Sequence, residues 1–234
     1  MQSITKKSIL IIILILICDQ TLKIWVKTHM TLGESIPIIN NFFFIKFIEN
    51  PGMAFGIDIP GAFGKLSLTL FRILAAIGIG FYLRSLIIHK AHSGLIICLS
   101  LVMAGAIGNI IDSTFYGLIF TESNYFAPSL IFPEGGGYAS LLHGKVVDML
   151  YFHVLEGTYP NWLPFIGGNE FVFFRPIFNI ADSSISCGVI AILIFQKRFF
   201  TGLRESSDTD PQSEQNTESP SSVEETEIKL SETP

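Results

Sequence analysis

The chain alternates long apolar stretches with polar segments, and four of the apolar stretches are long enough to cross a lipid bilayer. A helix rises about 1.5 Å per residue, so about 20 apolar residues span the hydrocarbon layer. The predicted transmembrane helices cover residues 8–26, 66–88, 95–112 and 177–195. The first stretch is predicted to be a retained helix rather than a signal peptide, because no small-residue cleavage site follows it.

Two long segments, 27–65 and 113–176, are predicted to be outer loops between the helices. Residues 41–57 (NFFFIKFIENPGMAFGI) place aromatic and β-branched side chains around a Pro-Gly turn, which predicts strand, turn and strand lying against the bilayer surface. The second segment is long for a connection and holds three consecutive glycines, 135–137. Such length is typical of a functional loop.

Composition agrees with a membrane protein. Hydrophobic residues make up 49% of the 234 residues and charged residues 15%, against roughly 25% charged in soluble domains. Residues 201–234 carry nine acidic and two basic side chains, so this tail accounts for the overall charge of −5 and is predicted to be disordered and cytoplasmic. Residues 1–200 are predicted to form one transmembrane domain. No basic stripe indicates a nucleic-acid partner.

Basic residues predict the orientation of the helices. Cytoplasmic connections carry an excess of Lys and Arg. Clusters of such residues flank the same side of all four predicted helices: Lys6, Lys7, Arg84, Lys90, Lys197, Arg198 and Arg204. Both termini are therefore predicted to be cytoplasmic.

Carboxylates stand out within the apolar stretches. An ionisable residue inside a membrane helix costs about 2.5–3.5 kcal/mol on insertion scales, so it indicates function by default. With the predicted orientation, the polar residues of three helices lie near the outer membrane boundary, and a further carboxylate lies in the second outer loop: Asp19, Asn109, Asp112, Asp182 and Asp148.

Two carboxylates that share a site suggest hydrolysis. One is held protonated while its ionised partner takes a proton from water, which then attacks a carbonyl. Asp148 and Asp182 are the candidate pair, and Asn179, one helical turn from Asp182, would orient a carboxylate. Structural alternatives remain open: a helix cap for Asp182, a loop acid for Asp148, a packing amide for Asn179, and an i, i+4 ion pair between Asp19 and Lys23.

Five short motifs occur in order between about Ser8 and Phe195. They are Asp19-Gln20-x-x-Lys23, Asn50-Pro51-Gly52-x-Ala54-Phe55, Gly105-x-x-Gly108-Asn109-x-x-Asp112, Val146-Val147-Asp148 and Phe178-Asn179-x-Ala181-Asp182. Taken together, the set resembles the lipoprotein signal peptidase family, also called signal peptidase II.

This resemblance implies an α-helical integral membrane protein of the bacterial inner membrane, with four transmembrane helices and a small extracytoplasmic β-cradle. It implies a monomeric aspartic endopeptidase without metal or cofactor, in contact with membrane lipids and inhibited by globomycin. The enzyme would remove the signal peptide from diacylglyceryl-modified prolipoproteins just before the lipidated Cys. The catalytic pair would be Asp148 and Asp182. The supporting or substrate-binding residues would be Asp19, Lys23, Asn50, Gly105, Asn109, Asp112, Asn179 and Ala181.

The chain departs from the family pattern in two places. Ser113 stands where the family usually has Arg, so Lys145 or Arg175 is predicted to supply the missing positive charge. The distance from Asn109 to Asp148 is longer than usual, so Ser113 to His143 is interpreted as an insertion.

Two other functions compete with this interpretation. An intramembrane aspartic protease of the presenilin kind would show a GxGD pattern, which is absent. A small transporter or proton relay could use the intramembrane aspartates Asp19, Asp112 and Asp182, but such proteins usually show internal repeats or paired broken helices, and the sequence has neither.

Overall fold

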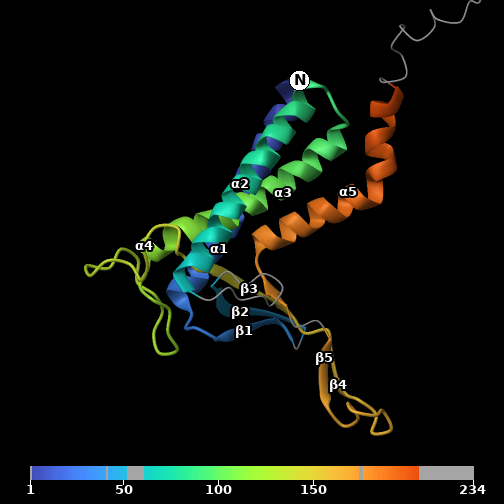
Figure 1. Ribbon diagram of the computed structural model, residues 1–234. Coiled ribbons are helices and arrows are strands. Elements are labelled where there is room, and N and C mark those ends of the chain that lie inside the picture. Colours follow the sequence, from blue (N-terminus) through green and yellow to red (C-terminus); the bar gives the residue numbers. More distant parts are fainter. Residues whose placement is uncertain (1, 41, 52–60, 174–175, 206–234) are drawn as a thin grey trace, which may run out of the picture.

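The computed structural model describes residues 2–40, 42–51, 61–173 and 176–205 (Figure 1). In this part of the chain, four helices are long and apolar enough to cross a membrane: α1 (Gln2–His29), α2 (Gly61–Ile88), α3 (Ser93–Ile111) and α5 (Ile180–Glu205). A helix satisfies its own backbone hydrogen bonds, which lipid cannot do. The prediction of a four-helix membrane protein is confirmed.

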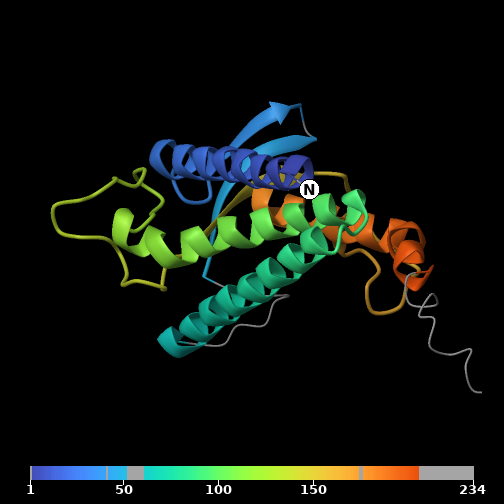
Figure 2. The ribbon, with the colours of Figure 1, turned by 90° about the horizontal axis from the view of Figure 1, so that it is seen from above.

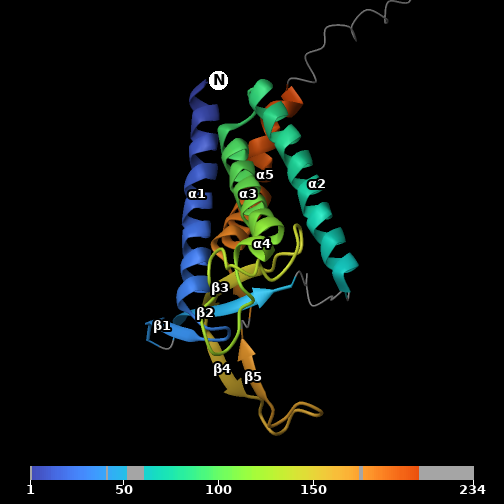
Figure 3. The same ribbon diagram turned by 90° about the vertical axis from the view of Figure 1, so that its left-hand side faces the viewer.

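Helix α3 is the centre of the bundle, where it packs against α1, α2 and α5. Figure 2 shows α3 between α1 and α2, and Figure 3 shows the helices side by side with the strands gathered at one end. The N-terminus lies at the opposite end from the strands. One end of the bundle therefore consists of helices alone, and the other end combines helices with the sheet.

The sheet has four antiparallel strands in the order β1 (Ser35–Ile39), β2 (Phe43–Asn50), β3 (Val146–Phe152) and β6 (Ile177–Phe178). A separate hairpin of β4 (Leu155–Thr158) and β5 (Glu170–Phe173) extends beyond this sheet (Figure 1). The small sheet outside the helices, which the resemblance implied, is confirmed. Strand β6 leads directly into α5, so the sheet determines where that helix begins.

An apolar core joins the helices to the sheet. Its buried side chains include Val26 from α1, Met30 directly after α1, Phe47 from β2 and Met149 from β3. Burying each such side chain contributes about 1.5–3 kcal/mol. This core explains why α1 continues three residues beyond its predicted end at residue 26, because its last turn packs on the sheet.

Other predicted boundaries also differ from the structure: α1 begins at Gln2 rather than at residue 8, and α5 ends at Glu205 rather than at residue 195. Helix α2 begins at Gly61 rather than at residue 66. The predicted third helix, 95–112, begins earlier, at Ser93, and continues past Ile111 into a π-helical turn, η1 (Asp112–Tyr116), and a short helix, α4 (Gly117–Ile119). The fourth long helix, α5, begins at Ile180, whereas it was predicted to begin at residue 177. Residues 177 and 178 instead pair with Tyr151 and Leu150 of β3, which the apolar pattern alone could not distinguish from a helix.

The two long segments that were predicted to be outer loops hold more strand than predicted. Strand β2 lies within the predicted 41–57 region, whereas β1 was not predicted. The second predicted strand of that region and Gly52 of its turn lie outside the described residues. Asp148, predicted to lie in a loop, belongs to β3. In the tail, residues 201–205 end α5, and residues 206–234 lie outside the described part.

Candidate active site

Asp148 and Asp182 lie at the end of the bundle where helices and sheet meet. Asp148 is buried on β3, and Asp182 is half-buried in the first turn of α5. Two asparagines connect them: Asn179 Nδ2 donates to Asp148 Oδ1 (2.7 Å), and Asn109 Nδ2 donates to Asp182 Oδ1 (2.7 Å). The asparagines contact each other through Asn179 Nδ2 and Asn109 Oδ1 (3.2 Å). The carboxylates thus share one hydrogen-bonded group although they are far apart in the sequence.

Asn179 has a different position from the one predicted. It precedes α5 instead of lying on the helical face beside Asp182. Its Oδ1 accepts a hydrogen bond from the backbone N–H of Asp182 (2.8 Å), which is the bond an N-cap residue makes. One amide therefore starts the helix with its oxygen and holds Asp148 with its nitrogen, so capping fixes Asp182 relative to Asp148.

A buried lysine ties this group to α1. Lys23 Nζ lies 2.8 Å from both Asp19 Oδ2 and Asp112 Oδ2, and it donates to Asn109 Oδ1 (3.1 Å). All three charged side chains are at most 1% exposed. The i, i+4 pair of Asp19 and Lys23 exists, so this alternative is correct, but the pair is also part of the larger network.

Asp19 and Asp112 each accept a hydrogen bond from the backbone next to one member of the candidate pair. Asp19 Oδ1 accepts from the backbone N–H of Ala181 (2.9 Å), next to Asp182. Asp112 Oδ2 accepts from the backbone N–H of Val147 (3.2 Å), next to Asp148. Charge-assisted bonds of this kind are stronger than neutral ones. The lysine network therefore positions both strand β3 and helix α5.

Gln20 and Tyr116 complete the network. Gln20 Nε2 donates to Asp112 Oδ1 (2.9 Å) and to Asp19 Oδ2 (3.1 Å), and Tyr116 donates its hydroxyl hydrogen to Gln20 Oε1 (3.1 Å). Gln20 belonged to a motif but was not among the predicted site residues. Tyr116 was missed altogether, since an aromatic residue in an apolar stretch gives no signal of a polar role.

The environment of Asp148 favours its protonated form. Burial, and then the negative charge of Asp182, raise the pKa of the Asp148 carboxyl to about 7. The charge of Lys23 and the hydrogen bond from Asn179 oppose this rise. One member of the pair can therefore carry a proton near neutral pH, as a shared carboxylate site requires.

Two glycines allow the helices to approach closely. A Cβ on Gly105 would lie 2.2 Å from the backbone oxygen of Ala181, and a Cβ on Gly108 would lie 2.8 Å from Asp19 Oδ2. Gly105 and Ala181 thus serve as a point of contact between α3 and α5. Gly105 supports the site through packing, whereas Ala181 also donates its backbone N–H to Asp19 Oδ1.

We expect the substitution Gly105→Ala to push α5 away from α3 and so lower both activity and stability. Overpacking of this kind costs about 1–3 kcal/mol. The matched control is Gly78→Ala on α2, where an added Cβ would meet nothing within 4 Å. Thermal unfolding in detergent and substrate cleavage measure the two effects. Equal behaviour of the two variants would show that α5 tolerates the displacement.

The predicted insertion, Ser113 to His143, is anchored to the end of α1. Buried Lys27 forms an ion pair with Glu49 of β2 and hydrogen bonds with Ser123 Oγ (2.7 Å). Burial opposes ionisation of Glu49, but the charge of Lys27 and the hydrogen bonds from Lys27 and Ser123 bring the pKa of Glu49 below its ordinary value. The next residue, Asn50, ends β2 opposite Val146. The insertion therefore braces the strand that carries this predicted site residue.

The charge expected near Ser113 comes from an element that the sequence did not indicate. Arg72 Nη1 of α2 donates to Ser113 Oγ (3.2 Å). Lys145, one predicted replacement, forms ion pairs with Glu49 (3.3 Å) and Glu122 (3.2 Å), so its role near Ser113 stays a prediction. The other candidate, Arg175, lies outside the described residues.

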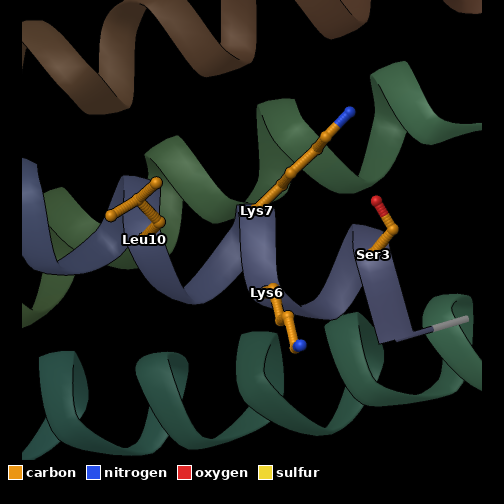
Figure 4. Close-up of a pocket in the computed structure, with 4 residues that line it drawn as sticks. All are labelled: Ser3, Lys6, Lys7 and Leu10. Carbon is orange, nitrogen blue, oxygen red and sulfur yellow. The ribbon is translucent and has the colours of Figure 1, made fainter.

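Other features of the surface lie away from this site. A shallow pocket of about 540 Å³ is lined by Ser3, Lys6, Lys7 and Leu10 near the N-terminus, where the two lysine side chains point in opposite directions (Figure 4). It lies on the first turns of α1, far along that helix from Lys23. Within the described residues, no group of three or more His, Cys, Asp or Glu side chains is suited to hold a metal ion.

Comparison with known proteins gives consistent matches. The family model for signal peptidase II matches residues 11–198. A protein of Porphyromonas gingivalis named lipoprotein signal peptidase is 50% identical over 204 residues, covering 86% of this chain and 88% of that one. One of the same name from Amoebophilus asiaticus is 37% identical, covering 80% of this chain and 76% of its own. A bacterial membrane enzyme solved by the in meso method at 2.3 Å has a TM-score of 0.53 and 28% identity, covering 88% of this chain and 93% of its own.

Proposed function

This chain belongs to the signal peptidase II family, and from that premise we propose that it removes signal peptides from lipid-modified prolipoproteins with Asp148 and Asp182 as its catalytic pair. The observation that carries the proposal is the shared hydrogen-bonded group of the two carboxylates, at one end of a membrane bundle. The bond cut would be the one just before the diacylglyceryl-modified Cys.

Different surroundings suggest different roles for the two carboxylates. Asp148, buried and with its pKa raised to about 7, would hold a proton and donate a hydrogen bond to the scissile carbonyl. Asp182, half-buried, would be the ionised partner that takes a proton from the attacking water. The tetrahedral intermediate then collapses as the proton passes to the leaving amine. The pair titrates as a unit, so its two pH limits belong to both residues.

The asparagines would keep the pair aligned through this cycle. Each donates one short hydrogen bond to one carboxylate, so neither aspartate can rotate away when its partner changes charge. A location at the membrane boundary would let water reach the carboxylates while the acyl chains of the substrate stay in lipid. A globomycin-like cyclic peptide would inhibit by occupying the same space.

The protein is a multi-pass membrane protein, and its basic clusters support an orientation with cytoplasmic termini and the candidate site at the outer face. The alternative of a small transporter or proton relay is not favoured, because the chain belongs to a peptidase family. The buried aspartates Asp19 and Asp112 also have a structural explanation in their ion pairs with Lys23.

The proposal is tested with the purified protein in lipid nanodiscs and one prolipoprotein offered in two forms. We expect cleavage before the Cys when it carries the diacylglyceryl group, and at least about 100-fold slower cleavage of the unmodified form, because the acyl chains supply binding energy that is used at the scissile bond. Mass spectrometry of the products measures both the rate and the cut. Equal cleavage of the two forms, or cleavage of neither, would contradict the proposed substrate.

A further inference from the structure

Arg72 is a charged residue within α2, a helix whose sequence is largely apolar. It lies within the membrane-spanning part of α2. Placing a guanidinium there costs free energy, so its presence indicates a function. It is only partly exposed and does not sit at the end of its helix, unlike Arg84, which is exposed and close to the last turn. A hydrogen bond or a nearby negative charge must therefore offset the free energy of placing Arg72 in the membrane.

The contacts of Arg72 lead toward the aspartate pair. Its Nη1 donates to Ser113 Oγ (3.2 Å), and Ser113 follows Asp112, whose Oδ2 holds the backbone of Val147 beside Asp148. Arginine carries five N–H donors in a rigid plane. The bond to Ser113 occupies one of them, and no hydrogen bond from the other four to a described residue is seen.

The electrostatic interactions of Arg72 point the same way. Three carboxylates, Asp182, Asp148 and Asp112, lie close enough to interact electrostatically with its guanidinium. Lys23, the other cation near the pair, is already shared between two carboxylates at 2.8 Å. Of these two cations near the pair, Arg72 is the one that makes no direct ion pair with a described carboxylate.

We propose that Arg72 is a positioning residue that acts as the counter-charge of the aspartate pair, supplied by α2 and held in place by Ser113. This rests on the proposed function. A singly ionised carboxylate pair carries a net negative charge, which a nearby fixed cation stabilises before and during attack by water. Arginine suits this task because it stays charged at every working pH. The charge that the family places directly after Asp112 would thus come from another helix in this chain.

The charged groups that face the pair come from several elements. Besides Arg72 of α2 and the pair itself on β3 and α5, they are Lys23 and Asp19 of α1 and Asp112 of η1. The Lys27–Glu49 pair belongs to the insertion anchor. Removal of Arg72 leaves this remaining set with two negative charges to one positive, so the pair should become easier to protonate.

The experiment compares wild type with Arg72→Gln in nanodiscs, using the diacylglyceryl-modified prolipoprotein. We expect kcat to fall about 10- to 100-fold with KM changed less than about threefold, because the charge acts mainly in the transition state. We also expect the acid limb of the pH–rate profile to move upward by about 0.5–1 pH unit, since a lost cation favours protonation of the pair. Arg84→Gln, on the same helix, is the matched control and should change neither quantity.

A relocation variant separates electrostatics from folding. Ser113 Oγ is the atom that Arg72 reaches, so Ser113→Arg in the Arg72→Gln background would return a guanidinium to nearly the same place. We expect this double variant to return the acid limb of the pH–rate profile to its wild-type position and to recover at least part of kcat. The single variant Arg72→Lys, which keeps the charge, should have an acid limb close to that of wild type but a lower kcat.

The acid limb decides the outcome. If the acid limb of the pH–rate profile does not move in Arg72→Gln, the inference is overturned, whether kcat is normal or lost. A residue with a purely structural role would lower kcat without moving the acid limb. If wild type itself fails to process the lipidated substrate, the proposed function fails, which is a distinct result. Membrane levels and thermal unfolding of each variant show that it is folded.

Discussion

Replacing either Asp148 or Asp182 with Asn is expected to lower the rate of prolipoprotein cleavage by at least about 10³-fold, since each variant removes one of the two proton positions that the proposed reaction uses. Asparagine keeps the size and the hydrogen-bond acceptor for Asn179 or Asn109. The double variant should be no slower than either single one, because residues that act as a unit lose their effect together. Cleavage of the diacylglyceryl-modified substrate measures all three.

The Asp148→Asn substitution should not lower the stability of the folded protein. Since the pKa of Asp148 is raised from 3.8 to about 7, its ionised form is disfavoured in the folded protein. The resulting cost is absent below about pH 4, grows as the pH rises, and is complete above about pH 7. Asp148→Asn should therefore unfold at the same or a higher temperature than wild type at pH 8. An inactive variant that also unfolds early would place Asp148 in the scaffold instead.

A matched control for the chemical change is Glu134→Gln. Glu134 is an exposed carboxylate in the same segment between α3 and α5 as Asp148, so it undergoes the same chemical substitution without touching the pair. We expect its cleavage rate to equal that of wild type. Normal processing by Asp148→Asn or by Asp182→Asn would remove that residue from the proposed mechanism.

The gathering of the polar residues was predictable, because two simple physical rules determine it. Charge is costly in lipid, and basic residues mark the cytoplasmic side, so Asp19, Asn109, Asp112 and Asp182 had to lie near one end of their helices. The structure places them there together. The motif spacing and order indicated the same group, and the family comparison agrees with the resemblance they carried.

The connections within the group were less predictable. Asn179 has the residue type and the distance from Asp182 of an N-cap, but the continuous apolar stretch from residue 177 hid the start of the helix. Strand β1 has no strong alternation to indicate it. Arg72 of α2 contacts Ser113, and Tyr116 of η1 contacts Gln20 of α1, across segments that are distant in the sequence, and such contacts leave no trace in local spacing.

Replacing Lys23 with Met is expected to lower the free energy of unfolding by about 3–5 kcal/mol, since it leaves two buried carboxylates without their shared cation. Activity should fall as well, because Asp19 and Asp112 hold the backbone beside both members of the pair. Denaturation of the protein in detergent, followed by tryptophan fluorescence, measures the loss. The matched control is Lys7→Met, an exposed lysine on the same helix, which should unfold like wild type.

A combined variant tests whether the loss comes from unpaired charge. In Lys23→Met with Asp19→Asn and Asp112→Asn, no buried charge remains in this network, and replacing a whole buried ionic group is often close to neutral for stability. We therefore expect most of the lost free energy of unfolding to return, while cleavage stays impaired because the amides hold Ala181 and Val147 less firmly than carboxylates do. Should the triple variant stay as unstable as Lys23→Met, packing of the lysine stem would carry the stability instead. The network would then position the catalytic pair by shape more than by charge.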